Sequence, residues 1–126
     1  MNNVSRMEIP NRMRSINVRM LIDDQQIVST VDYLIDNVGV TPVAIWVKTK
    51  KSESTLDREL RSSGKAVSLL LQFGCSLKEI SETFTRDSYI GSAVWYINKN
   101  LEDIIAGNQP DKLPNLSTQP TGYTIK

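Results

Sequence analysis

The sequence predicts an α+β fold in which an N-terminal antiparallel β-meander precedes two or three C-terminal α-helices packed on one face. Two observations indicate this order. Up to residue 48 the hydrophobic residues mostly alternate with polar ones, and the connections between the apolar runs are short enough for hairpins. After residue 54 the hydrophobic residues recur every three or four positions, as they do in amphipathic helices.

Three strands are predicted in the first half of the chain. In the first, every second residue from position 16 to 22 is hydrophobic. Residues 27–35 form the second, although Leu34 interrupts its alternation, and residues 42–48 have the β-branched and aromatic content of a third. The turns between them are expected at residues 23–26 and 36–39, which are polar or contain glycine.

A long helix is predicted to follow the strands. Ser54 is its candidate N-cap, with Asp57 three residues later, and Gly74 is a suitable C-terminal stop. Gly64 lies in the middle of this segment and lowers its helix propensity. The glycine therefore indicates either a close packing contact or a boundary between two helices.

Two further helices complete the domain. Ser76 and Glu79 have the spacing of a capping box at the start of a short helix. The last helix is expected to begin after a polar loop at residues 85–88, with Asp87 or Ser88 as its N-cap, and to end at Gly107.

The chain divides into three parts by composition. Residues 1–14 are polar and basic and are expected to form an irregular N-terminal arm, whereas residues 15–107 form a single α+β domain. Residues 108–126 contain three prolines and few hydrophobic residues. They are predicted to be a flexible tail, or an arm ordered only against a partner.

Composition narrows the classes of function. The chain has 126 residues, of which 40% are hydrophobic, and its formal net charge is +1. A charge so close to neutral argues against binding to polymeric nucleic acid, which usually needs a pronounced basic excess. The first fifteen residues lack the apolar run of a secretory signal, and no stretch is long enough to span a membrane. A cytoplasmic protein that does not bind membranes is expected.

The residue types also argue against catalysis. The chain has no histidine, and its single cysteine, Cys75, cannot form an internal disulfide or a multi-cysteine metal site. Glu79 and Glu82 share a helical face, but this spacing is typical of solvated helix surfaces. We therefore predict that the protein is not an enzyme and needs neither a metal nor a cofactor.

An anion-binding site is predicted at the loop before the last helix. The start of a helix has backbone N–H groups without helical partners, and a glycine in the first turn permits close approach of a ligand oxygen. Arg86 offers a forked pair of donors that suits a phosphate, and Phe84 or Tyr89 has a ring on which a base can stack. The predicted ligand-binding residues are Phe84, Thr85, Arg86, Ser88, Tyr89, Gly91, Arg12 and Arg14, the last two folding back from the arm.

A purely structural interpretation of the same loop is also open. Phe84 fits the hydrophobic stripe of the short helix, and Arg86 can bind Asp87 or a carbonyl group. Trp46 and Trp95 are interpreted as packing or subunit contacts. Because three short helices cover only one face of a three-stranded sheet, a homo-oligomer, dimeric or larger, is expected.

Several segments together resemble a known domain. They are Pro10-Asn11-Arg12, the strands, residues 66–74 (AVSLLLQFG), residues 75–80 (CSLKEI) and Thr85-Arg86-Asp87 before Ile90-Gly91. In this order they look like the TSCPD-type domain, which occurs at the ends of ribonucleotide reductases and in small stand-alone proteins. The resemblance covers roughly residues 9 to 105.

Small stand-alone phage proteins of similar size and layout include the Thoeris anti-defence sponges. The resemblance to them implies that this chain binds a cyclic ADP-ribose-type signalling nucleotide without cleaving it, at sites formed between subunits. The expected setting is the cytoplasm of a host bacterium. The alternative function is that of an accessory or regulatory domain that docks on a ribonucleotide reductase or another protein.

Overall fold

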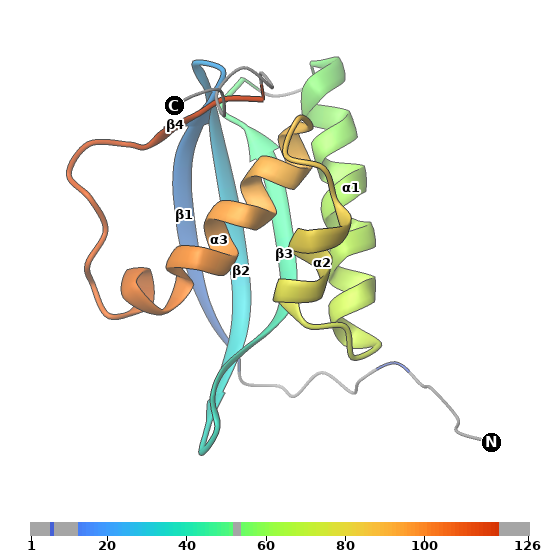
Figure 1. Ribbon diagram of the computed structural model, residues 1–126, viewed down its shortest axis with the longest axis vertical. Coiled ribbons are helices and arrows are strands. Elements are labelled where there is room, and N and C mark those ends of the chain that lie inside the picture. Colours follow the sequence, from blue (N-terminus) through green and yellow to red (C-terminus); the bar gives the residue numbers. More distant parts are fainter. Residues whose placement is uncertain (1–5, 7–12, 52–53, 119–126) are drawn as a thin grey trace.

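The computed structural model describes residues 6, 13–51 and 54–118. Its elements in chain order are β1 (Arg14–Ile22), β2 (Gln25–Asp36), β3 (Gly39–Thr49), α1 (Thr55–Gln72), α2 (Leu77–Thr83), α3 (Tyr89–Ile105) and β4 (Asn115–Leu116) (Figure 1). The predicted α+β class, with a meander followed by helices, is confirmed, and a short fourth strand is added. No helix within the described part is long and apolar enough to cross a membrane.

The strands form one sheet with the order β3-β2-β1-β4. The first three are antiparallel neighbours, whereas β4 lies parallel to β1. At the β1–β2 turn Asp23 and Asp24 have positive φ angles of 48° and 65°. Two consecutive left-handed residues are typical of the tightest hairpin turns, and aspartate tolerates this conformation better than most residues. Helices α2 and α3 lie over one face of the sheet, and α1 runs alongside β3 at its edge (Figure 1).

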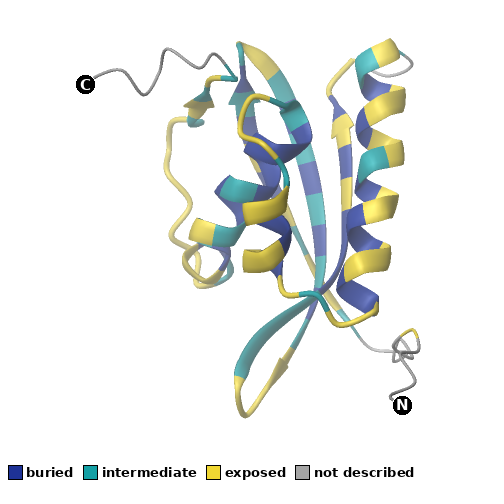
Figure 2. Cartoon of the chain, turned by 45° about the vertical axis from the view of Figure 1, so that its right-hand side comes forward, coloured by how far each residue is buried: buried dark blue, intermediate teal, exposed yellow. Residues whose placement is uncertain are grey.

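The core lies between the sheet and the helices. Alternate residues of the strands point into it, and Figure 2 shows buried and less buried positions following one another along them. The buried hydrophobic stripe of α3 is completed by leucines of α1 and by Leu77 and Ile80 of α2. The strand residues with no exposed surface are Val18, Met20, Ile22, Ile27, Ser29, Val31, Val43 and Ile45.

Helix α1 covers the outer edge of the sheet. The Ser68 hydroxyl bonds both the N–H and the carbonyl of Ile45, at 2.8 and 2.9 Å, and Gln72 Nε2 donates to the carbonyl of Val43. These side chains satisfy backbone groups of β3 that a second sheet would otherwise pair with. A Cβ on Gly64 would lie 3.1 Å from the Ile45 oxygen, so this glycine marks a close packing contact within one continuous helix.

The hairpin that joins β2 and β3 extends beyond the helical layer (Figure 1). At its tip an Asp36 carboxylate oxygen accepts the N–H groups of Val38 and Gly39. Val38 is 95% exposed, and Ile35, which shares its strand face with core residues, is 50% exposed. Because no helix covers the end of the hairpin, its hydrophobic residues are exposed even though they continue the alternation of the strand.

The segment after α3 differs from its prediction as a flexible tail. Residues 108–118, here called the strap, run back along β1. The N–H groups of Leu21 and Asp23 donate to the carbonyls of Pro114 and Leu116, at 2.8 and 2.9 Å. The strap is ordered against its own sheet edge because β1 would otherwise expose unpaired donors there. Residues 119–126 lie outside the described part.

Asp23 forms hydrogen bonds with the end of the strap, and these bonds depend on pH. Its carboxylate accepts the hydroxyl and N–H of Thr118, and these bonds, with the weaker one from the Tyr89 hydroxyl, hold the pKa of Asp23 below its ordinary value. A carboxyl group whose pKa is lower in the folded than in the unfolded protein stabilises the folded state. This stabilisation is complete above the pKa of the unfolded state and is lost as the pH falls through the pKa of the folded state. We expect the strap to open selectively below about pH 4.

Hydrogen exchange of the strap amides at falling pH measures this opening. Asp23→Asn is the matched variant, because asparagine also adopts positive φ but does not titrate. It should exchange faster than the wild type at neutral pH and lose the acid-dependent step. An acid step of the same size in Asp23→Asn would contradict the assignment to Asp23.

Candidate functional site

The chain itself occupies the start of α3. The Ser88 hydroxyl accepts the N–H of Gly91 at 3.0 Å and donates to the carbonyl of Thr85 at 2.8 Å. A Cβ on Gly91 would lie 1.8 Å from that same carbonyl oxygen. Gly91 therefore does permit the close approach of an oxygen to the first turn, but the oxygen belongs to Thr85. A cradle for a ligand phosphate at this position would require the loop to move.

The Arg86 side chain lies on the outer surface of α3. Its guanidinium carbon is 3.7 Å from the centre of the Trp95 ring, and the Lys99 ammonium is 5.4 Å from the same centre. Cations at these distances are attracted to the ring face. Trp95 is partly buried and packs against the core, so it gives both cations a fixed platform.

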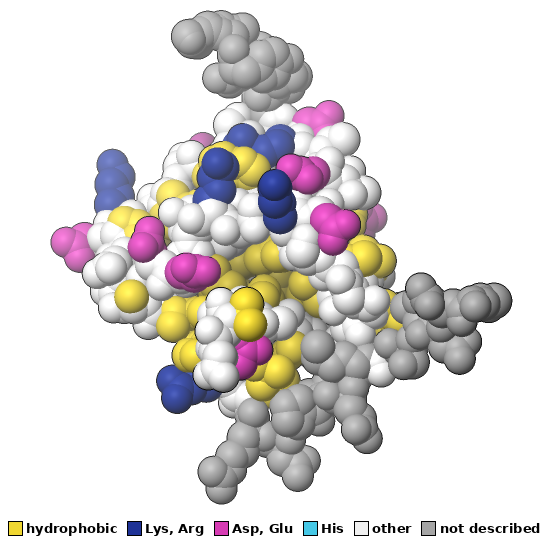
Figure 3. All heavy atoms as spheres, turned by 60° about the horizontal axis from the view of Figure 1, so that its bottom comes forward, with side chains coloured by type: hydrophobic (Ala, Val, Ile, Leu, Met, Phe, Trp, Pro, Cys, Tyr) yellow, Lys and Arg dark blue, Asp and Glu magenta, His cyan; other side chains and the backbone are white. Residues whose placement is uncertain are grey.

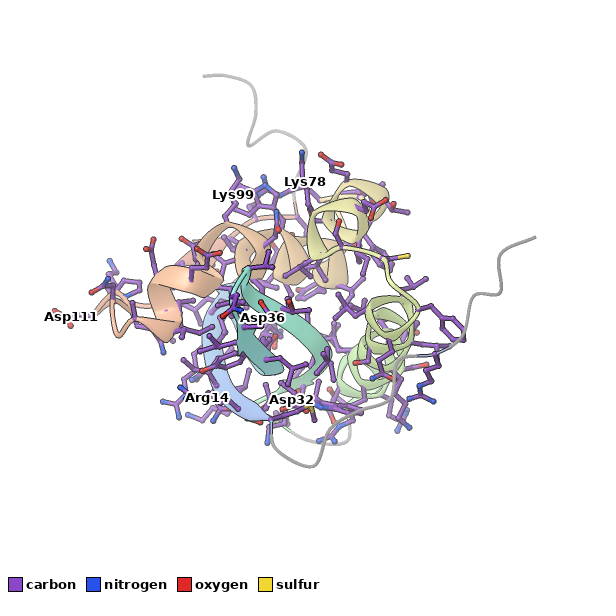
Figure 4. The ribbon with its side chains drawn as sticks, turned by 90° about the horizontal axis from the view of Figure 1, so that it is seen from below. Arg14, Asp32, Asp36, Lys78, Lys99 and Asp111 are labelled. Carbon is purple, nitrogen blue, oxygen red and sulfur yellow. The ribbon has the colours of Figure 1, made fainter. Side chains whose placement is uncertain are left out.

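A third cation, Lys78 of α2, lies on the same side of the molecule as Lys99, and Figure 4 shows the two projecting from neighbouring helices. We call Lys78, Arg86, Trp95 and Lys99 the Trp95 cluster. Within the described residues none of its three cations forms an ion pair with a carboxylate, so its positive charge is not neutralised by direct contact.

Lys78 also lines a pocket of about 470 Å³, whereas Arg86, Trp95 and Lys99 are not among the lining residues. The pocket lies where the base of the β2–β3 hairpin meets the helices, and Figure 3 shows hydrophobic side chains gathered in a hollow on this side of the molecule. Its apolar lining is formed by Val40, Pro42, Leu71, Leu77 and Leu101, and its polar lining includes Thr41, Ser76, Asn98 and Glu102. Apolar walls with a few polar groups are typical of small-molecule sites.

The two aromatic residues predicted to stack on a base have other positions. Phe84 is partly buried and packs against the core, and it ends α2 as its C-cap. Tyr89 also packs against the core, with its hydroxyl bonded to Asp23. Burial, and then the charge of Asp23, raise the pKa of Tyr89. The ring in contact with Arg86 is that of Trp95 instead.

The arginines of the arm do not complete the predicted site. Arg14 is the first residue of β1, whereas Tyr89 bonds Asp23, just past the other end of that strand. Nine residues of strand correspond to roughly 27 Å. Figure 4 also shows Arg14 on the opposite side of the molecule from Lys78 and Lys99. Arg12 lies outside the described residues.

Sequence reasoning missed Trp95, Lys99 and Lys78 as site residues. Trp95 and Lys99 are four positions apart in a helix, a spacing that places side chains on one face and is visible in the sequence. The contact between Arg86 and Trp95 carries no such signal, because it depends on the path of the loop between α2 and α3. The predicted packing role of Trp95 and its role as a platform are compatible.

No match to this chain is found among protein-family models, curated proteins or solved structures. Among the described residues no group of three histidine, cysteine or carboxylate side chains is arranged to bind a metal ion. The chemistry that the Trp95 cluster offers is attraction of negative charge, beside a pocket that accepts an apolar or flat group.

Proposed function

We propose that this protein binds and sequesters a cyclic ADP-ribose-type signalling nucleotide without cleaving it, as an anti-defence protein of a phage. The observation that carries the proposal is that Arg86 and Lys99 lie against the Trp95 ring, while Lys78, on the same side of the molecule as Lys99, lines the 470 Å³ pocket. The resemblance to Thoeris anti-defence sponges supplies the ligand class.

In this arrangement the base and the phosphates of the ligand contact different parts of the site. An adenine ring enters the pocket, where Leu71, Leu77 and Leu101 remove its faces from water. The bridging phosphates meet Lys78, Lys99 and the fork of Arg86, which form charge-assisted hydrogen bonds. Glu102 lines the same pocket, so the phosphates must point toward Lys78 and away from Glu102.

Sequestration requires affinity and slow release, and no proton transfer. A signal present at micromolar concentration must be bound with a dissociation constant in the nanomolar range, which corresponds to about 12 kcal/mol. Two phosphates paired with cations and one enclosed base are a plausible source of that energy in a shared crevice. The proposal therefore includes a homo-oligomer, in which a second subunit closes the open side of the pocket.

Retention of intact nucleotide tests the function. The protein is mixed with cyclic ADP-ribose isomers, separated from free nucleotide and heated, and the released material is identified by mass spectrometry. We expect the nucleotide to return unchanged. Release of a cleaved product would indicate an enzyme, and failure to retain any isomer would contradict sequestration.

Arg86→Ala is expected to weaken nucleotide binding by about 1.5 to 3 kcal/mol, the usual contribution of a hydrogen bond to a charged group. The loss corresponds to roughly a 10- to 150-fold rise in the dissociation constant, measured by isothermal titration calorimetry. Lys112→Ala is the matched control, because it removes one exposed cation from the strap, which contributes no residue to the Trp95 cluster or to the pocket. Equal affinities of the two variants would place the site elsewhere.

The alternative function, docking on a ribonucleotide reductase or another protein, is favoured by a different surface. Leu69, Leu70 and Phe73 are 40 to 44% exposed on the outer side of α1, where Figure 2 shows an exposed helix face. Exposed apolar groups at helical spacing are typical of contact surfaces. A protein that retains no nucleotide but captures the reductase from a host lysate, and loses it in Leu70→Glu, would support this alternative.

A further inference from the structure

A second concave site lies where the face of the sheet opposite α2 and α3 meets the side of α1. A pocket of about 410 Å³ is lined by Thr30, Trp46, Val47 and Lys48 of the strands and by Arg61 and Lys65 of α1. It shares no lining residue with the pocket beside the Trp95 cluster. The two pockets therefore can be changed independently.

Trp46 offers an exposed aromatic surface in this pocket. Its side chain is 46% exposed, although the strand on which it lies contributes to the core. The indole Nε1 donates to an Asp32 carboxylate oxygen at 3.0 Å, and the other oxygen of that carboxylate accepts the Ser15 hydroxyl. The indole is thus held in one orientation from its edge, which leaves the ring available for stacking.

Three cations line the same pocket as the indole. Lys48 lies two residues along the same strand, and Arg61 and Lys65 are one turn apart on α1. Arg61 is positioned by an ion pair of 2.8 Å with Asp57, a carboxylate that is itself 2% exposed. Lys48 and Lys65 are exposed side chains. A ring flanked by cations is complementary to a base flanked by phosphates.

The polar surface continues from this pocket across the sheet. Lys48 is opposite Val28, which is opposite Arg19 of β1, so a fourth cation lies in register on the far strand. Beside it the Thr30 hydroxyl donates to Asn17 Oδ1 at 2.8 Å. The row of cations runs from α1 to β1 and spans roughly 10 Å between β3 and β1 alone. This width suits a ligand with phosphates on both sides of the stacked base.

We propose that the open face of the sheet binds single-stranded nucleic acid, with one base stacked on Trp46 and neighbouring phosphates at Lys48, Arg61 and Lys65. The net charge of +1 predicts the opposite, but it averages over the whole molecule. Lys48, Arg61 and Lys65 gather at one pocket, whose lining includes no acidic residue. Asp32 and Asp57 approach the pocket from outside this lining, where they bond Trp46 and Arg61. The local charge, and not the average, acts on a strand at this surface.

The probe is a fluorescein-labelled oligothymidylate of about 12 nucleotides, a length that covers a typical single-strand site. Fluorescence anisotropy gives its dissociation constant. With three phosphates neutralised, the constant should rise about 18-fold between roughly 50 and 200 mM salt. Trp46→Ala should raise it about 5- to 150-fold, the range for loss of one stacked base.

Tryptophan fluorescence locates the contact. In a Trp95→Phe background Trp46 is the sole tryptophan, and the unlabelled oligonucleotide should quench its emission. Lys65→Ala should weaken oligonucleotide binding and reduce its salt dependence, whereas Lys112→Ala, in the strap, should leave both unchanged. Circular dichroism verifies that each variant folds.

Two results would overturn the proposal. One is an unquenched Trp46 at low salt with excess oligonucleotide. The other is equal affinity for adenosine monophosphate and for the oligonucleotide, which would indicate a site for free nucleotides. Retention of a cyclic ADP-ribose isomer by Trp46→Ala and Lys65→Ala is measured in parallel. The sheet-face proposal and the sequestration proposal can therefore fail separately.

Discussion

Gly91→Ala is expected to lower the free energy of unfolding by about 3 kcal/mol, the upper end of what overpacking usually costs. The added methyl group would lie 1.8 Å from the Thr85 carbonyl oxygen and 2.7 Å from the Ser88 hydroxyl. These atoms bond each other at the start of α3, so the loop must move and the helix loses its N-cap arrangement. Urea denaturation followed by circular dichroism measures the loss.

Gly64→Ala is the matched comparison within the same chain. Its methyl group would lie 3.1 Å from the Ile45 carbonyl oxygen and 3.2 Å from the Val47 nitrogen, so a shift of a few tenths of an ångström relieves the contact. Alanine also favours the helix by about 1 kcal/mol over glycine. The two effects should nearly cancel. A Gly91→Ala variant no less stable than Gly64→Ala would show that the Thr85 loop is not packed as described.

Asp57→Ala is expected to reduce stability by about 2 to 3 kcal/mol, because it removes a buried carboxylate that accepts both the N–H and the hydroxyl of Thr49. The Asp57 carboxylate accepts the N–H of Thr49 at 2.8 Å and is ion-paired with Arg61. Without it the N–H of Thr49 on the edge strand is left in a buried position without this acceptor. The connection between β3 and α1 should open first.

Two further variants separate the causes of that loss. Arg61→Ala removes the same ion pair from its half-exposed side and should cost less than about 1 kcal/mol, because its solvated contribution is small. Asp57→Asn keeps one acceptor for Thr49 and should fall between the two. Thermal unfolding of the three variants gives the order. If Arg61→Ala were as unstable as Asp57→Ala, the ion pair would outweigh the bond to the β3 backbone.

Local sequence patterns predicted most of the fold. The alternation from residue 16 to 22 and the turn at Asp23-Asp24 define the first hairpin, and the Ser76 capping box begins α2 as expected. Ser54 and Ser88 are the N-caps of the other two helices. These features depend on residues within a few positions of one another, so they are visible in the chain itself.

The pairing of the strap with β1 could not be predicted from the sequence. Its prolines and low apolar content are typical of a flexible tail, yet residues 115 and 116 pair with β1. What orders the strap is the unpaired edge of a strand more than ninety positions earlier, together with the Asp23 carboxylate. Composition cannot report a partner so distant in the chain.

In the candidate site, too, some features could be predicted from the sequence and others depend on tertiary packing. The sequence alone determined that the chain has no histidine, that Arg86 lies in a loop before a helix, and that catalysis is not its expected activity. Only the tertiary structure decided that Thr85 fills the first turn of α3, that Trp95 lies under Arg86, and that Arg14 is at the far end of β1. Caps and turns arise from neighbours in the sequence, whereas clusters of charge form wherever packing brings separate elements together.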